Sequence, residues 1–215
     1  MPIRSLFLLT SLALVAGSCG ELSAQLAPAD LPRAQLLRDH IAALGPNVRG
    51  DEAQVVAERA YGTAERFHRT YGFTWPPLFN NFLVHVGIHK RGFCFQFAED
   101  LLLDLDSLKV TTLELHWGEA RPGRWGEHNC VVVTAKGQPF RDGILLENWR
   151  LCGHLFWSTV AVDHFPWVED GEYAALVRRK FAAKESPALS RNIPRREATA
   201  DIPAPREAPL DRSFH

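Results

Sequence analysis

The spacing of apolar residues changes about halfway along the chain. In residues 31–44 and 51–71, apolar side chains recur every three or four positions, with an aspartate near each start and a glycine just past each end. These features are typical of amphipathic helices. A Lys90-Arg91-Gly92 break then separates two further apolar stretches, which we expect to form helices at 77–89 and 94–105.

Beyond Lys109 the pattern becomes the two-residue alternation of half-buried strands, with many β-branched residues. We expect a small antiparallel sheet built from residues 110–117, 128–134, 144–149 and 156–162, followed by a helix at 171–184. Helices that come first and strands that come second favour an α+β domain, in which the helices pack on one face of the sheet.

The N-terminus has the features of an export signal. A basic residue precedes an apolar run at 6–15, and small residues at 16–18 precede Cys19. The run is too short to cross a bilayer, which needs about 20 apolar residues. Small residues before a cysteine resemble the lipobox of bacterial lipoproteins, in which Cys19 would be acylated and would anchor the protein to a membrane. Ala16 stands where that pattern usually has leucine, so ordinary signal cleavage further along is the alternative.

Composition divides the chain into four parts. We expect a signal peptide at 1–19, a linker at 20–30, one domain at 31–184 and a proline-rich disordered tail at 185–215. Nearly all of the six tryptophans and thirteen phenylalanines lie in the domain, which gives ample material for a core. The net charge of -1, without a basic stripe or a glycine-rich phosphate loop, argues against a nucleic-acid partner, and we expect no cofactor.

Candidate chemistry begins at Cys94, the first residue of a predicted helix. A thiol nucleophile needs a stabilised anion, a nearby base and a group that orients the base. The helix N-terminus favours an anion, and Gly92 allows a tight turn into the helix. His128, which opens a predicted strand, is the best candidate for the base.

The predicted hairpin supplies the third group. If Gly137-Gln138 is a two-residue turn, His128 faces Glu147 directly, and such side chains lie about 5 Å apart at Cβ. A one-residue slip would place Asn148 there instead.

Three short blocks at residues 91–101, 127–129 and 143–150 resemble the transglutaminase-like branch of the papain-type cysteine hydrolases, and also a set of bacterial envelope proteins with the same pattern. The resemblance implies a papain-like core and the roles of nucleophile, base and orienting residue for Cys94, His128 and Glu147.

The chain departs from the family at the third role. The family commonly has aspartate followed by proline where this chain has Glu147-Asn148, so Asn148 and Asp142 are alternatives for the orienting residue.

The resemblance implies an exported hydrolase or transamidase that transfers acyl groups from peptide or amide substrates, in the cell wall or on an envelope protein. The expected location is the periplasm or an outer-membrane anchor. The alternative is a non-catalytic envelope lipoprotein module that uses the same fold for binding or scaffolding.

The backbone N–H of Cys94 is the expected oxyanion donor, with a second donor near Trp75 or at Asn81. Trp125 lies in the loop before His128, where it would either line a substrate groove or simply pack.

Other chemistry-bearing residues leave alternatives open. His85 and His89 have a spacing that can bind zinc, but we expect a half-buried helix face and no metal. Cys130 and Cys152 would form either a disulfide, as export favours, or two separate buried thiols.

Overall fold

The structure is a computed structural model, and it describes residues 26–185. The expected signal peptide with Cys19, and all of the expected tail beyond residue 185, lie outside the described residues. The helices are α2 (Leu31–Ala42), α3 (Gly50–Tyr71), α4 (Pro77–His85), α5 (Cys94–Asp106) and α6 (Gly171–Glu185). The strands are β1 (Leu113–Ala120), β2 (His128–Ala135), β3 (Ile144–Leu151), β4 (His154–Thr159) and β5 (Trp167–Glu169), with a 3-10 turn, η1, at Phe140–Asp142.

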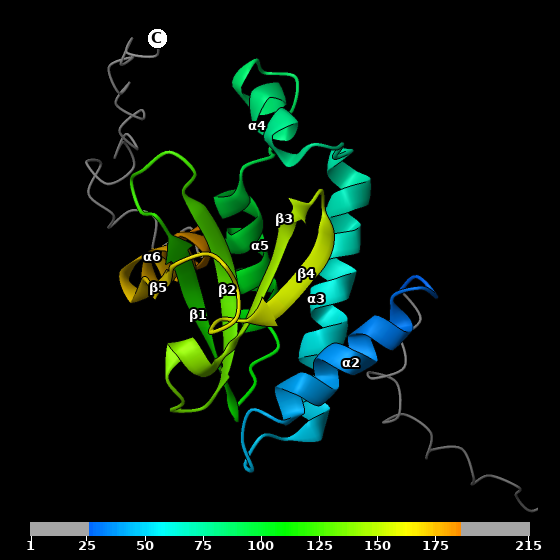
Figure 1. Ribbon diagram of the computed structural model, residues 1–215, viewed down its shortest axis with the longest axis vertical. Helices are drawn as coiled ribbons and strands as arrows, with labels where there is room; N and C mark the ends of the chain where they lie inside the picture. The colour runs from blue at the N-terminus through cyan, green and yellow to red at the C-terminus, as the bar shows by residue number, and fades with distance from the viewer. Residues whose placement is uncertain (1–25, 186–215) are drawn as a thin grey trace, which may run out of the picture.

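The five strands form one antiparallel sheet in the order β4-β3-β2-β1-β5. Three hairpins connect β1 to β4, and the chain then crosses the sheet to add β5 to the outer edge of β1. Figure 1 shows α5 against the central strands and α3 alongside β4. The fold is therefore α+β, as the order of helices and strands predicts.

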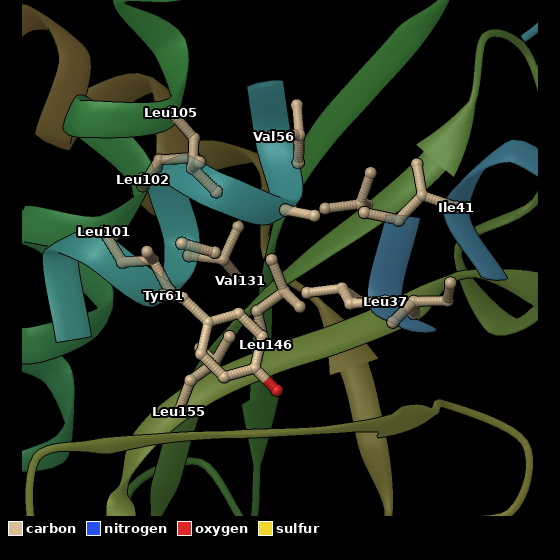
Figure 2. Close-up of a cluster of buried hydrophobic side chains, with 14 of the residues drawn as sticks. Leu37, Ile41, Val56, Tyr61, Leu101, Leu102, Leu105, Val131, Leu146 and Leu155 are labelled. Atoms are coloured by element: carbon tan, nitrogen blue, oxygen red, sulfur yellow. The ribbon is translucent and has the colours of Figure 1, made fainter. Parts of the chain in front are cut away.

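The alternation of side chains divides the sheet into two packed faces. Val131, Val133, Ile144 and Leu146 join the main core under the helices. Figure 2 shows how side chains of α2, α3 and α5 meet those of β2, β3 and β4 there, including Leu37, Val56, Leu101 and Leu155. Burial of one such side chain contributes roughly 1.5–3 kcal/mol. The other face carries a smaller cluster around Cys130, Val132 and Leu145.

The domain begins earlier than the sequence pattern indicates. Leu26 is 7% exposed and belongs to the main core, where it lies beside Gly62 of α3. The expected linker at 20–30 is thus wrong at its C-terminal end, because an isolated leucine gives no periodic signal.

Strand β1 starts at Leu113, three residues later than predicted. The carboxylate of buried Glu52 accepts hydrogen bonds from the backbone N–H groups of Thr111 (3.0 Å) and Thr112 (2.8 Å), and from both hydroxyls. These backbone groups bond to a helix side chain instead of to a strand, so the ladder cannot include them.

Helix α4 is shorter than the predicted 77–89. It ends at His85 because Gly87 takes a left-handed conformation (φ 77°), and the N–H groups of Ile88 and His89 both bond to the carbonyl of Leu83. His85 and His89 therefore do not share a helix face, and that interpretation of the pair is wrong.

The predicted register between β2 and β3 is wrong by two residues. The strands pair Val131 with Leu146 and Val132 with Leu145. The cause is the connection, which includes η1 and is longer than a two-residue turn. A shift of two residues keeps every side chain on its predicted face. Glu147 consequently lies diagonally from His128 instead of directly opposite.

No helix within residues 26–185 is long and apolar enough to cross a membrane.

We predict that Glu52→Gln lowers the free energy of unfolding by about 2 kcal/mol near neutral pH, because an amide cannot accept all four hydrogen bonds. Urea unfolding measures the change. Burial raises the pKa of Glu52, but hydrogen bonds from Thr112 and Thr111 outweigh it and lower the pKa from 4.5 to about 2. The stabilisation is thus complete above about pH 4.5 and is lost as the pH falls towards 2.

The variant should lack this acid-dependent loss. Glu172→Gln, at an exposed position of α6, is the matched control and should change stability by less than about 0.5 kcal/mol. Equal stability of Glu52→Gln and the unmodified chain near neutral pH would contradict the role given to this carboxylate.

Candidate functional site

Helix α5 begins at Cys94 because the turn before it is fixed by close packing at Gly92 and by hydrogen bonds to Gln96. A Cβ on Gly92 would lie 2.7 Å from Val84 Cγ2 and 2.9 Å from the carbonyl oxygen of Asn80, so only glycine fits. The side chain of Gln96 accepts hydrogen bonds from the backbone N–H groups of Gly92 (2.8 Å) and Phe93 (3.1 Å). The predicted position of Cys94 at the helix N-terminus is confirmed.

The half-buried thiol of Cys94 lies against residues that flank His128. Its Sγ is 3.8 Å from the carbonyl oxygen of Glu127 and 3.7 Å from Nδ2 of Asn129. The indole N–H of buried Trp117 donates to Oδ1 of Asn129 at 3.1 Å. This bond fixes the amide so that its NH2 group faces the sulfur.

His128 is 2% exposed at the start of β2. Its Nε2 donates to Oε2 of Glu147 at 3.0 Å. The predicted contact between these two residues is present despite the register shift, because a diagonal neighbour is still within reach of a long side chain. Nδ1 is buried and has no hydrogen-bond partner among the described residues, so it is the nitrogen left for Cys94.

The electrostatics of the imidazole reflect both neighbours. Burial lowers the pKa of His128, but interactions with the side chains of Cys94 and then Glu147 outweigh it and raise the pKa from 6.5 to about 9. The protonated imidazole is therefore favoured at neutral pH, next to a thiol.

Behind Glu147 runs a chain of buried charges. Oε1 of Glu147 lies 2.5 Å from Nε of Arg150, and Nη1 of Arg150 lies 2.8 Å from Oδ2 of Asp163. Burial raises the pKa of Asp163, but hydrogen bonds from Arg150, the backbone of Phe165 and the indole of Trp167 outweigh it and lower the pKa. The guanidinium of Arg150 thus contacts two buried carboxylates. With protonated His128, the two positive and two negative charges of this group sum to zero.

Three aromatic rings surround the imidazole. The ring centroids of Trp149, Phe165 and Trp167 lie 5.2, 5.1 and 5.5 Å from that of His128. The indole N–H of Trp149 donates to Oδ1 of Asn81 and to the carbonyl of Gly92, each at 3.1 Å. Asn81 therefore positions an aromatic wall of the site through its oxygen.

The alternatives for the third group are not beside the imidazole. Asn148 is 1% exposed, and neither polar atom of its side chain has a hydrogen-bond partner among the described residues. It follows Glu147 on the strand and so points to the opposite face. Asp142 is exposed in η1, at the far end of the β2–β3 hairpin from His128.

Trp75, expected near a second oxyanion donor, and Trp125, expected to line a groove or to pack, are both open to solvent. Trp75 is 74% exposed before α4, and Trp125 is 89% exposed in the loop before β2. Neither packs in the core.

Cys130 and Cys152 are separate thiols, so the disulfide between them is wrong. Cys130 is fully buried on the second face of the sheet, and burial raises the pKa of its thiol. Burial also raises the pKa of Cys152, whose Sγ donates to the carbonyl of Thr74 at 3.2 Å. In residues 26–185, no three His, Cys, Asp or Glu side chains gather as they would around a metal.

Sequence reasoning missed Asn129, Arg150, Asp163 and the aromatic segment at 165–167. Asn129 carried a usable signal, since it is a polar residue inside a strand of β-branched residues. Arg150 and Asp163 are ordinary surface types in sequence, and the aromatic segment gives no sign of which residue it packs against, so only the fold brings them to His128.

Comparison with protein-family models, with curated proteins and with solved structures gives no match to this chain.

We predict that Cys94→Ala lowers the pKa of His128 below about 9, because the Cys94 side chain is the first of the groups that raise it. An NMR titration of the imidazole Cε1–H signal, assigned with His128→Gln, measures the shift. Cys152→Ala is the control and should leave this titration unchanged. An unchanged midpoint in Cys94→Ala would show that the two side chains do not interact.

We predict that Arg150→Met destabilises the protein by about 3 kcal/mol, because it leaves two buried carboxylates without their cation. Arg38→Met removes an exposed ion pair with Asp39 and should cost at most about 1 kcal/mol. Urea unfolding of both variants tests the contrast, and similar losses would argue against a buried charge network.

Proposed function

We propose that the protein is a thiol-dependent acyl-transfer enzyme, a hydrolase or transamidase, with Cys94 as nucleophile, His128 as general base and acid, and Glu147 as the residue that orients the imidazole. The observation that carries the proposal is the imidazole held between a thiol and a carboxylate, with one ring nitrogen bonded to Glu147 and the other left for Cys94. This arrangement of nucleophile, base and orienting group is what covalent acyl transfer requires.

In the first half of the reaction, the reacting pair is the Cys94 thiolate beside protonated His128, whose Nδ1 carries the proton. The thiolate attacks the substrate carbonyl carbon, a C–S bond forms, and the carbonyl oxygen takes the negative charge. The imidazolium then donates its proton to the departing nitrogen or oxygen, the bond to the leaving group breaks, and a thioester remains on Cys94.

In the second half, water or an amine attacks the thioester, and His128 accepts its proton. The C–S bond breaks, the acid or the new amide leaves, and the Cys94 thiolate beside protonated His128 is restored. Water makes the protein a hydrolase and an amine makes it a transamidase.

The negative charge needs donors on the protein. The backbone N–H of Cys94 at the α5 N-terminus is one donor. The NH2 group of Asn129, which Trp117 aims at the sulfur, is placed to stabilise the thiolate before attack. Asn81 is the candidate for a second donor through its NH2 group, since its oxygen accepts from the indole of Trp149.

We propose a peptide or other amide as substrate, in the cell envelope of an exporting bacterium, with Cys19 as the lipid-anchor residue. The signal-like N-terminus supports the location, and the carbonyl-directed thiolate supports the substrate class. The alternative is a non-catalytic envelope module, and the following experiments distinguish it from an acyl-transfer enzyme.

Alkylation by iodoacetamide near neutral pH tests the nucleophile, with peptide mass spectrometry of Cys94 and half-buried Cys152 in one sample. We expect Cys94 to react at least about tenfold faster than Cys152, and His128→Ala to remove most of this advantage. Asn129→Asp should also slow Cys94, because it sets a negative charge against the thiolate. His85→Ala, at an exposed position, is the control and should change nothing.

A second measurement tests acyl transfer itself. With p-nitrophenyl acetate, we expect a burst of p-nitrophenolate and one acetyl group on Cys94, and Glu147→Gln should slow both formation and hydrolysis of this thioester. An unreactive Cys94 would overturn the nucleophile. A reactive Cys94 that never acylates would overturn acyl transfer and favour the binding module.

A further inference from the structure

Helix α4 and its flanks present apolar side chains to solvent. Thirteen large apolar side chains are exposed within residues 26–185, and six of them fall in the short segment 75–88. These six, which we name the α4 apolar surface, are Trp75, Leu78, Phe79, Phe82, Val86 and Ile88. Contiguous exposed apolar surface of this kind usually marks an interaction site.

Helix α4 buries a polar residue and exposes its apolar residues, which is the reverse of a helix that packs on a hydrophobic core. Its buried residue is Asn80, whose side chain bonds to the backbone of Thr74 at 3.1 and 2.9 Å. Phe79 and Phe82 point outward, with stacked rings 6.0 Å apart. A helix that packs on its own domain turns the apolar stripe inward. The outward stripe therefore requires an apolar environment from elsewhere.

The surface projects from the molecule and is firmly held. Figure 1 shows α4 at one end of the fold, beyond the ends of α3 and β3. Asn80 ties it to the preceding loop, and Asn81 ties it to Trp149 of β3 through a 3.1 Å hydrogen bond. A projecting apolar tip suits a deformable medium, whereas a folded protein partner would need a matching groove.

Charge around the tip points to the kind of medium. No aspartate or glutamate occurs from Phe73 to Ala98, while His85 and Lys90 are exposed in that segment. Aromatic and aliphatic residues with a lysine beside them, and no acidic residue, are the composition of surfaces that enter an anionic lipid interface.

We propose that the α4 apolar surface inserts into the interface of a membrane that contains anionic phospholipids, with Trp75 among the headgroups and Lys90 near the phosphates. The proposal goes beyond acyl transfer and holds whether or not Cys94 turns over a substrate. It also differs from a lipid on Cys19, because it places a specific face of the folded domain against the bilayer.

The path of the chain gives this contact a consequence. Residues 86–93 lead from α4 directly to Cys94 at the start of α5. A docked α4 therefore brings the thiol close to the lipid surface and favours substrates at that surface over substrates free in solution.

Hydrogen–deuterium exchange of the full chain tests the proposal residue by residue. Deuterium uptake is followed by mass spectrometry with and without phosphatidylcholine vesicles that contain phosphatidylglycerol. We expect peptides that cover residues 74–90 to exchange at least about threefold more slowly with vesicles, and peptides of α2 to stay unchanged. Pure phosphatidylcholine vesicles should protect the segment less.

The double variant Phe79→Ser/Phe82→Ser should lose this protection, while Leu36→Ser, which removes a 53% exposed leucine from α2, should keep it. Unchanged exchange of α5 and β2 without vesicles shows that the double variant is folded. Vesicle binding that leaves 74–90 unprotected would assign binding to the N-terminus and overturn the proposal. Protection that rises with protein concentration without vesicles would assign the surface to a second copy and also overturn it.

Discussion

The candidate site depends on one constraint, which is that the buried carboxylate of Glu147 must be neutralised. Glu147 is 3% exposed, and a lone charge at such depth would cost several kcal/mol. Two cations meet the requirement, Arg150 on one oxygen and protonated His128 on the other. Arg150 in turn needs Asp163, which draws the segment after β4 over the second face of the sheet. The same carboxylate thus sets the charge of the base and the path of the chain around it.

The register of the central hairpin explains why glutamate can fill this position. In a directly opposed pair, an aspartate would reach the imidazole. In the observed register Glu147 is a diagonal neighbour, and the extra methylene of glutamate spans the additional distance. Glutamate at this position therefore keeps the contact with the imidazole, since the longer side chain and the diagonal register compensate for one another.

Much of the fold was accessible from the sequence, because periodicity reports burial. The starts of α2 and α5, the helices-first order and the three inner strands follow from it. The contact between His128 and Glu147 was expected from a turn-based register that is wrong by two residues, and it is present because the shift keeps both side chains on one face. Features that depend on contacts between distant segments were not accessible. The late start of β1 depends on Glu52 of α3, and the surroundings of His128 depend on β5 and Asp163. Such residues carry no periodic signal, because contacts with distant segments fix them and not the burial of one face of their own element.

The three proposed site residues lie at the start of β2, in the middle of β3 and in the first turn of α5, away from the β2–β3 connection. In that connection Gly137 is exposed and adopts a left-handed backbone (φ 75°). Changes in the length or composition of the β2–β3 connection should therefore leave the position of the Cys94 thiol unchanged. The connection is accordingly where an affinity tag or a reporter domain could be inserted while the candidate site keeps its geometry.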